Sequence, residues 1–260
     1  MSSGILMEMT VEEVEAFGPE VVVFAVASVE AHGPHLPYGT DYYAGDAVVR
    51  RAVELANRQD ARALMYPTLP ISNNVNAKRR PFVCRIGVRT LMQTVLDILA
   101  AIAEDGVRKI VLWDAHGGNT DTLRATLRAF HDTQPVDGGV FVCMTYVPPE
   151  VFQAAGLAHP SCHGGEAETA RMMHLHPHLV RNDKLADFPF GKLAVDALES
   201  SNVYFVKPWH RCVPASAGGE TREATAELGQ RLVEGAAGYL ADLLVQLARA
   251  PWSEAFPYEA

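Results

Sequence analysis

The sequence predicts an α/β fold in which helices cover a largely parallel sheet. Apolar runs that suit buried strands alternate along the chain with stretches of helical periodicity, an order typical of parallel α/β sheets. The chain has 260 residues, 48% hydrophobic and 20% charged, as in globular proteins with a sizeable core. Because no internal repeat or linker divides it, we expect a single domain over residues 1–260.

The first part of the chain supplies two strands and a helix. Residues 21–29 are continuously apolar and rich in β-branched side chains, which suits a strand buried on both faces. Residues 42–58 place apolar side chains on one side of a helix, and residues 63–69 fit a second strand. Residues 70–81 are polar and rich in Asn, so we expect a loop there.

The middle of the chain continues the alternation. Residues 90–105 show clear helical periodicity, and Gly106 supplies a C-terminal stop. Residues 109–114 form an apolar strand. Asn119 is a suitable N-cap for a helix over residues 120–131.

The last part of the chain is less regular. Residues 140–146 predict a further strand and residues 166–175 a helix. We expect residues 185–218 to be mostly loop. A long amphipathic helix is expected over residues 220–249.

Charge and composition exclude several classes of function. The net charge is −9, whereas tight binding of nucleic acid needs clustered cations. Lys78, Arg79 and Arg80 are the only basic cluster, too short for more than a local contact with an anion. The four cysteines form no Cys-x-x-Cys pair, which excludes a disulfide scaffold and a zinc finger. We therefore expect no nucleic-acid partner.

The start of the chain lacks the cationic and apolar segments of a signal peptide. No apolar stretch approaches the length that crosses a bilayer. We therefore expect a cytoplasmic protein with no membrane partner.

The segment after the first predicted strand favours a metal site. Glu30 and His32 lie two residues apart, so in an extended backbone both side chains project to one face. Glycines and prolines turn the chain between them and Asp41. Mixed oxygen and nitrogen ligands suit Zn²⁺, Mn²⁺ or Fe²⁺ better than Ca²⁺ or Mg²⁺. The alternative is a surface turn with solvated polar groups.

A second polar segment follows the strand at 109–114. His116 is followed by Gly117, Gly118 and Asn119, and the glycines allow a ligand to approach the backbone closely. The same pattern occurs in the oxyanion loop of lipase-like hydrolases, which also need a Gly-x-Ser-x-Gly nucleophile. No serine of this chain lies in such a motif, which excludes a serine hydrolase.

The third polar segment precedes the helix predicted at 166–175. His163 and two glycines come before Glu166 and Glu168, which lie in the first turn. Acidic residues are favoured there by the helix dipole alone. Three segments with histidine and acidic residues at the ends of separate elements nevertheless favour one common site.

These three segments resemble the creatininase (creatinine amidohydrolase) family. The stretch from Glu30 to Asp41, Glu-Ala-His-Gly-Pro-His-Leu-Pro-Tyr-Gly-Thr-Asp, resembles the signature of that family. His-Gly-Gly-Asn at 116–119 and His-Gly-Gly-Glu-Ala-Glu-Thr at 163–169 match its later motifs in order. The resemblance implies a three-layer α/β/α fold, homo-oligomers that are often hexamers, and a centre with two divalent metal ions.

The resemblance also implies roles for individual residues. Glu30 and His116 correspond to ligands of one metal ion and His32 to a ligand of the other, with Asp41 bridging both. His163 matches the catalytic histidine. Creatininase completes its second metal site with a glutamate where this chain has Gly118.

We assign the missing ligand to Glu166 by compensation. Glu168 is interpreted as a structural acid.

The implied reaction is hydrolysis of a small cyclic amide or a related C–N bond by metal-bound hydroxide. Creatininase covers its substrate with tryptophans on the loop before the third motif, and residues 147–162 contain none. The small-molecule substrate is therefore left open. Two alternatives remain: a hydrolase that opens a cyclic ketone, such as a keto-inositol, by C–C cleavage, and a non-catalytic relative that binds a ligand or partner.

Overall fold

Four parallel strands form the central sheet, in the order β2-β1-β3-β4. Their bounds are Val21–Val26 for β1, Ala63–Met65 for β2, Lys109–Asp114 for β3 and Phe141–Thr145 for β4. Both inner strands, β1 and β3, are buried along their whole length, as expected for a sheet covered on two faces. The computed structural model describes residues 3–200 and 202–259.

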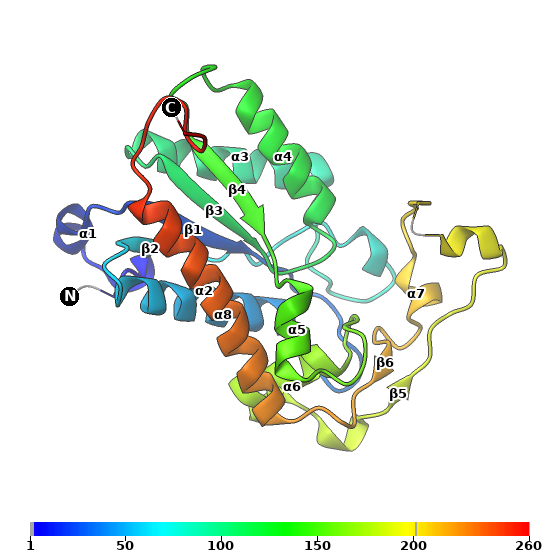
Figure 1. The fold of residues 1–260 in the computed structure, drawn as a ribbon. Helices are drawn as coiled ribbons and strands as arrows, with labels where there is room; N and C mark the ends of the chain where they lie inside the picture. The colour runs from blue at the N-terminus through cyan, green and yellow to red at the C-terminus, as the bar shows by residue number, and fades with distance from the viewer. Residues whose placement is uncertain (1–2, 201, 260) are drawn as a thin grey trace.

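Helices cover both faces of this sheet (Figure 1). Odd-numbered side chains of β1 pack with α2 and α8, whereas even-numbered ones pack with α3. The bounds of the helices are Thr40–Asn57 for α2, Val88–Glu104 for α3, Thr120–Asp132 for α4, Pro149–Ala155 for α5, Glu166–Leu175 for α6 and Ala226–Arg249 for α8. This arrangement confirms the predicted three-layer α/β/α fold.

Shorter elements lie around this core. They are η1 (Leu6–Glu8), α1 (Val11–Phe17), η2 (Val75–Ala77), η3 (Pro177–Leu179), η4 (Asn182–Lys184), β5 (Asp187–Phe188), η5 (Asp196–Glu199), α7 (Trp209–Cys212) and β6 (Gly219–Glu220). β5 and β6 pair as a small antiparallel sheet. Figure 1 shows η5, α7 and this sheet beyond the end of the central sheet to which the arrow of β4 points.

The structure differs from the expected elements mainly at their ends. The strand predicted at 21–29 ends at Val26, and the chain then turns into the segment that carries Glu30. The final helix begins at Ala226 rather than 220, because Gly219 and Glu220 pair with β5. Asn119 does not cap α4 with its side chain, which instead donates hydrogen bonds to the carbonyls of residues 26 and 27.

Three short α-helices, α1, α5 and α7, were not predicted. α1 begins with a capping box in which Thr10 and Glu13 bond reciprocally, a signal that the sequence contains.

Among the described residues, no helix combines the length and apolar character needed to cross a membrane.

Candidate metal centre

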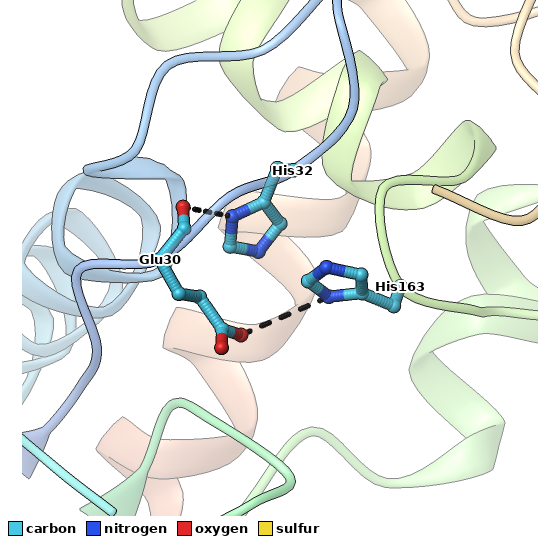
Figure 2. A group of neighbouring side chains, drawn as sticks. All are labelled: Glu30, His32 and His163. Carbon is cyan, nitrogen blue, oxygen red and sulfur yellow. Dashed lines mark hydrogen bonds and ion pairs between the residues drawn. The ribbon is translucent and has the colours of Figure 1, made fainter. Parts of the chain in front are cut away.

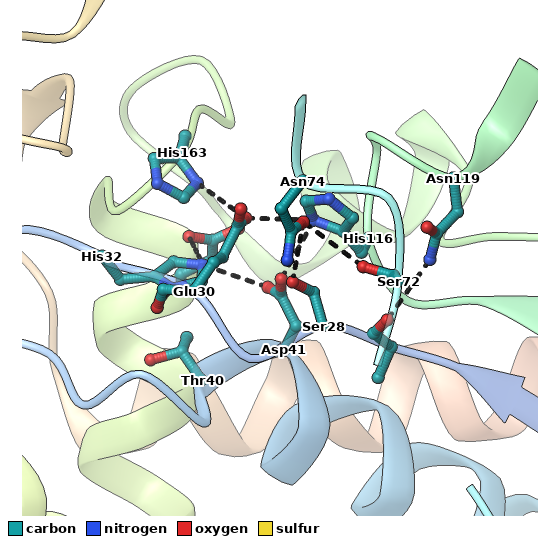
Figure 3. Close-up of polar contacts among 12 residues, drawn as sticks. Ser28, Glu30, His32, Thr40, Asp41, Ser72, Asn74, His116, Asn119 and His163 are labelled. Atoms are coloured by element: carbon teal, nitrogen blue, oxygen red, sulfur yellow. Dashed lines mark hydrogen bonds and ion pairs between the residues drawn. The ribbon is translucent and has the colours of Figure 1, made fainter. Parts of the chain in front are cut away.

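The three polar segments meet beyond the carboxyl ends of β1 and β3. Figure 3 shows Glu30 and His32 from the segment after β1, Asp41 from the first turn of α2, and His116 from the turn after β3. His163 joins them from the turn before α6. Parallel strands bring their carboxyl ends to one edge of the sheet, which is where ligands bind in this class of fold.

One group of side chains consists of Glu30, Asp41 and His116, all of them buried. The Nδ1 atom of His116 lies 3.1 Å from Oε1 of Glu30 and 3.0 Å from Oδ2 of Asp41. Both Glu30 carboxylate oxygens and Oδ2 of Asp41 nevertheless lack a hydrogen-bond partner among the described residues. Buried carboxylate oxygens without a partner are costly, and a cation held between them would satisfy all three.

A second group consists of His32, Asp41 and Glu168. Nε2 of His32 lies 3.1 Å from Oδ1 of Asp41 and 3.6 Å from Oε2 of Glu168. Nδ1 of the same ring lies 3.1 Å from the Glu30 backbone carbonyl, to which it donates. That bond leaves Nε2 of the neutral ring without a proton and aimed at two carboxylates, the orientation in which histidines ligate metals.

His163 faces Glu30 across the same space (Figure 2). Its Nε2 donates to the backbone carbonyl of Ala31 over 2.9 Å. Nδ1 lies 3.8 Å from Oε1 of Glu30. Since a carbonyl can only accept, the neutral ring keeps an unprotonated Nδ1 toward the carboxylates.

The charges of the site shift the pKa values of its histidines in opposite directions. Burial alone lowers the pKa of His32, but neighbouring carboxylates, above all Asp41, outweigh it and raise the value to about 10. The same balance raises the pKa of His116 through Glu30 and Asp41. Burial, and then the charge of His32, lower the pKa of His163. The carboxylates therefore favour positive charge, a proton or a metal ion, at the first two rings, whereas His163 stays neutral.

These observations fit two divalent cations. Each group combines carboxylate oxygen with imidazole nitrogen, a donor set suited to Zn²⁺, Mn²⁺ or Fe²⁺. The two groups share Asp41, whose two oxygens face different histidines.

Glu166, the ligand expected from the third motif, is not brought into either metal-binding group. Its carboxylate lies outside both groups, because Oε2 accepts a hydrogen bond from the backbone N–H of His159 at 2.8 Å. Glu168 lies beside His32 instead. Its Oε2 accepts a hydrogen bond from the backbone N–H of Gly164 at 2.6 Å, which holds the side chain against the turn before α6. The carboxylate of the third motif that faces His32 is therefore that of Glu168.

The structure explains why residue 118 is a glycine. A Cβ atom at this position would lie 2.4 Å from Nε2 of His116. With the ring of His116 placed as it is, no glutamate fits there.

Trp209 is a residue that the sequence reasoning missed. Its ring centroid lies 3.8 Å from that of His163 and 6.5 Å from that of His116. It begins the short helix α7, within the stretch 185–218 that was expected to be mostly loop. In the sequence this position is marked only by an aromatic residue in Pro-Trp-His-Arg. The number of residues between it and the three motifs does not indicate that it contacts them.

A cleft of about 820 Å³ opens from the metal-binding groups. It is lined by Glu30, Asp41, His116 and Glu168, and its walls include residues of η2, of the start of α4 and of the segments 198–200 and 203–209. This volume lies in the upper part of the range of about 300–1,000 Å³ for small-molecule sites.

The fold and the site define a parallel α/β protein with a candidate centre for two metal ions. Residues 7–244 match the family Creatininase (creatinine amidohydrolase). The chain therefore belongs to the creatininase family, whose members are metal-dependent amidohydrolases, and it is an enzyme of this class.

Individual relatives are distant but cover most of the chain. The mycofactocin precursor peptide peptidase of Mycobacterium ulcerans (strain Agy99) is 27% identical over 88% of this chain and 86% of its own. The creatinine amidohydrolase of Pseudomonas putida is 27% identical over 73% of this chain and 78% of its own. A crystal structure from Bacteroides fragilis NCTC 9343, described as a candidate creatinine amidohydrolase, is 26% identical with a TM-score of 0.84 and covers 98% of this chain and 100% of that one.

Proposed function

We propose that this chain uses two divalent metal ions to hydrolyse the C–N bond of an amide, either a small cyclic amide or a related substrate. The position of Asp41 carries the proposal. Its Oδ1 faces His32 and its Oδ2 faces His116, so one carboxylate reaches both metal-binding groups. A shared carboxylate is suited to hold two cations close enough to act together.

In this proposal Glu30, Asp41 and His116 hold one cation. His32, Asp41 and Glu168 hold the other. When bound, such cations supply a nucleophile from water at neutral pH and polarise the substrate carbonyl. Support comes from the carboxylate oxygens that lack partners and from the histidine nitrogen aimed at two carboxylates.

His163 moves the proton in this reaction. Its Nδ1 is the free acceptor of the neutral ring, because Nε2 donates to Ala31. Nδ1 takes the proton of the attacking water and then passes it to the nitrogen that leaves when the C–N bond breaks. The lowered pKa of His163 keeps the ring ready to accept that proton.

The cleft has room for a substrate larger than a single small ring. The cleft of about 820 Å³ leaves room beyond the metal centre, and Trp209 offers a flat aromatic surface beside His163. The relatives are named for a cyclic amide, creatinine, and for a precursor peptide. Both names describe hydrolysis of a bond between a carbonyl carbon and nitrogen, which is the chemistry proposed here.

Metal analysis and an amide panel test the proposal. Protein purified without chelators should contain two transition-metal ions per chain. It should hydrolyse at least one member of a panel of creatinine, five- and six-membered lactams and short peptides. Chelation should abolish this activity, and Zn²⁺, Mn²⁺ or Fe²⁺ should restore it. Full activity in protein shown to be free of transition metals would contradict the proposal.

Asp41→Asn is the most direct variant, because it removes charge from both metal-binding groups at once. We expect it to lose both metal ions together, with activity at background. Asp46→Asn is the matched control, since Asp46 lies on the same helix and contacts Thr68 instead. It should keep both metals and its activity.

We also propose that the enzyme is a cytoplasmic homo-oligomer. Large apolar side chains are exposed along one segment of the chain: Phe190, Val195, Val203, Tyr204 and Val206. Exposed apolar groups concentrated in this way are typical of contact surfaces. Light scattering coupled to size-exclusion chromatography measures the mass, and a monomer would contradict this part of the proposal.

A further inference from the structure

A cationic patch lies beside the cleft and is built from two segments that are far apart in the sequence. We call it the basic edge, and its members are Lys78, Arg79, Arg80, His210 and Arg211. The first three follow η2 directly, and the last two belong to α7. The tertiary structure thus adds His210 and Arg211 to the three basic residues at 78–80.

Contacts between the two segments hold the basic edge together. η2 packs against α7. The guanidinium of Arg80 donates a hydrogen bond to the carbonyl of Pro214, two residues beyond the end of α7. The pKa of His210 is lowered by desolvation and then by the arginines of the basic edge. The positive charges therefore act on one small region.

The charged members of the basic edge, Lys78 and its three arginines, are not neutralised by carboxylates. Within residues 3–200 and 202–259, no carboxylate lies within 4.0 Å of any member of this patch. Some other arginines of the molecule are paired with carboxylates, as Arg51 is with Glu234 and Arg222 with Glu220. In a chain of net charge −9, a group of unpaired cations is a local exception that attracts anions.

The basic edge adjoins the walls of the cleft. Asn76 of η2 and Trp209 of α7 line the cleft, and each lies within a few residues of the patch. Lys207 adds a further cation to the lining. A substrate with its amide bond at the metal-binding groups and its remainder along Trp209 would therefore extend toward these cations.

We propose that the basic edge binds an oxyanion group, a phosphate or a carboxylate, on the substrate whose amide bond is cleaved at the metal centre. This inference rests on the proposed function. Guanidinium groups match the geometry of both oxyanions and bind them through paired N–H donors. Cations at the edge of the cleft would also offset the repulsion of an anionic substrate by a chain of negative net charge.

Calorimetric titration of the metal-loaded, full-length protein tests the inference without turnover. The probes are ribose 5-phosphate against ribose and succinate against succinamide, so each oxyanion is compared with a neutral analogue. We expect ribose 5-phosphate or succinate to bind more tightly than its analogue, and the tighter of the two identifies the group. The variant Arg79→Gln/Arg211→Gln should bind that oxyanion roughly threefold to tenfold more weakly, since exposed charge pairs each contribute modestly.

Arg58→Gln/Arg108→Gln is the matched control. It removes the same charge from two exposed positions, one at the end of α2 and one before β3. Both lie at the amino ends of the strands, opposite the end that carries the metal-binding groups. This variant should bind both probes as the wild type does. Equal binding of oxyanion and neutral analogue, or equal loss in both double variants, would overturn the inference. A protein that hydrolyses no amide yet shows the specific loss would overturn the proposed function, and it would leave the basic edge as an oxyanion site without its assignment to an amide substrate.

Discussion

Glu168 shows how one backbone contact selects between two glutamates. The N–H of Gly164 binds its carboxylate over 2.6 Å and turns the side chain toward His32. Glu166, two residues earlier, points to the backbone of His159 instead. Residues two apart on a helix project in nearly opposite directions, so only one of them can face the centre.

Substituting these two glutamates separately tests the assignment. Glu168→Gln removes a negative charge from the group with His32 and Asp41, so we expect it to lose about one metal ion per chain and most of the activity. Glu166→Gln is the control, because its amide oxygen can still accept the N–H of His159, and it should keep both metals. Metal analysis after gel filtration measures the content. Loss of metal in Glu166→Gln alone would return the assignment to the residue first predicted.

At the scale of elements, the contact between α6 and α8 positions Glu168. Gly229 of α8 lies so close to α6 that a Cβ atom would be 1.9 Å from the carbonyl oxygen of Ala170. The helices can approach this closely only because residue 229 has no side chain. A bulkier residue would push α6, and with it Glu168, away from His32.

Two glycines of α8 give a matched pair of substitutions. Gly229→Ala should lower the free energy of unfolding by about 1–3 kcal/mol through overpacking. Gly238→Ala, where a Cβ atom meets nothing within 4 Å, should raise it by roughly 0.5–1 kcal/mol through helix propensity. Denaturant unfolding in the presence of chelator measures both. If Gly229→Ala were as stable as Gly238→Ala, the close contact of α6 and α8 would be wrong.

At the scale of the whole molecule, the metal centre joins parts of the chain that are far apart. Glu30 and Asp41 come from its first sixth, His116 from near its middle, and Glu168 from the start of α6. Ions bound by all of these segments stabilise only the folded arrangement, because the unfolded chain does not hold the ligands together.

Metal binding should therefore raise the melting temperature. Free metal at 100 times its Kd stabilises the folded state by about 2.7 kcal/mol, which corresponds to roughly 5–10 °C for a protein of this size. Differential scanning calorimetry with and without Mn²⁺ measures the shift, and Asp41→Asn should abolish it. An equal shift in the wild type and in Asp41→Asn would show that the ions bind elsewhere.

Long regular elements could be predicted from the sequence, whereas short ones could not. The strand at 109–114 and the helix at 166–175 have the predicted bounds, because an apolar run marks the strand and two glycines precede the helix, both of which are local properties of the sequence. β5, β6 and α7 span two to four residues each. Elements of that length depend on what packs against them, so local patterns do not reveal them.

The sequence by itself determined the family, the layered α/β fold and most of the candidate site. Glu30, His32, Asp41 and His116 stand in motifs whose residue types and order are specific, and strand ends bring such motifs to one edge. Only the tertiary structure placed Glu168 rather than Glu166 beside His32, brought Trp209 onto His163, and joined residues 78–80 to α7. Each of these three contacts depends on how the backbone runs in three dimensions, as at the turn of Gly164. The number of residues between two positions in the sequence does not predict such a contact.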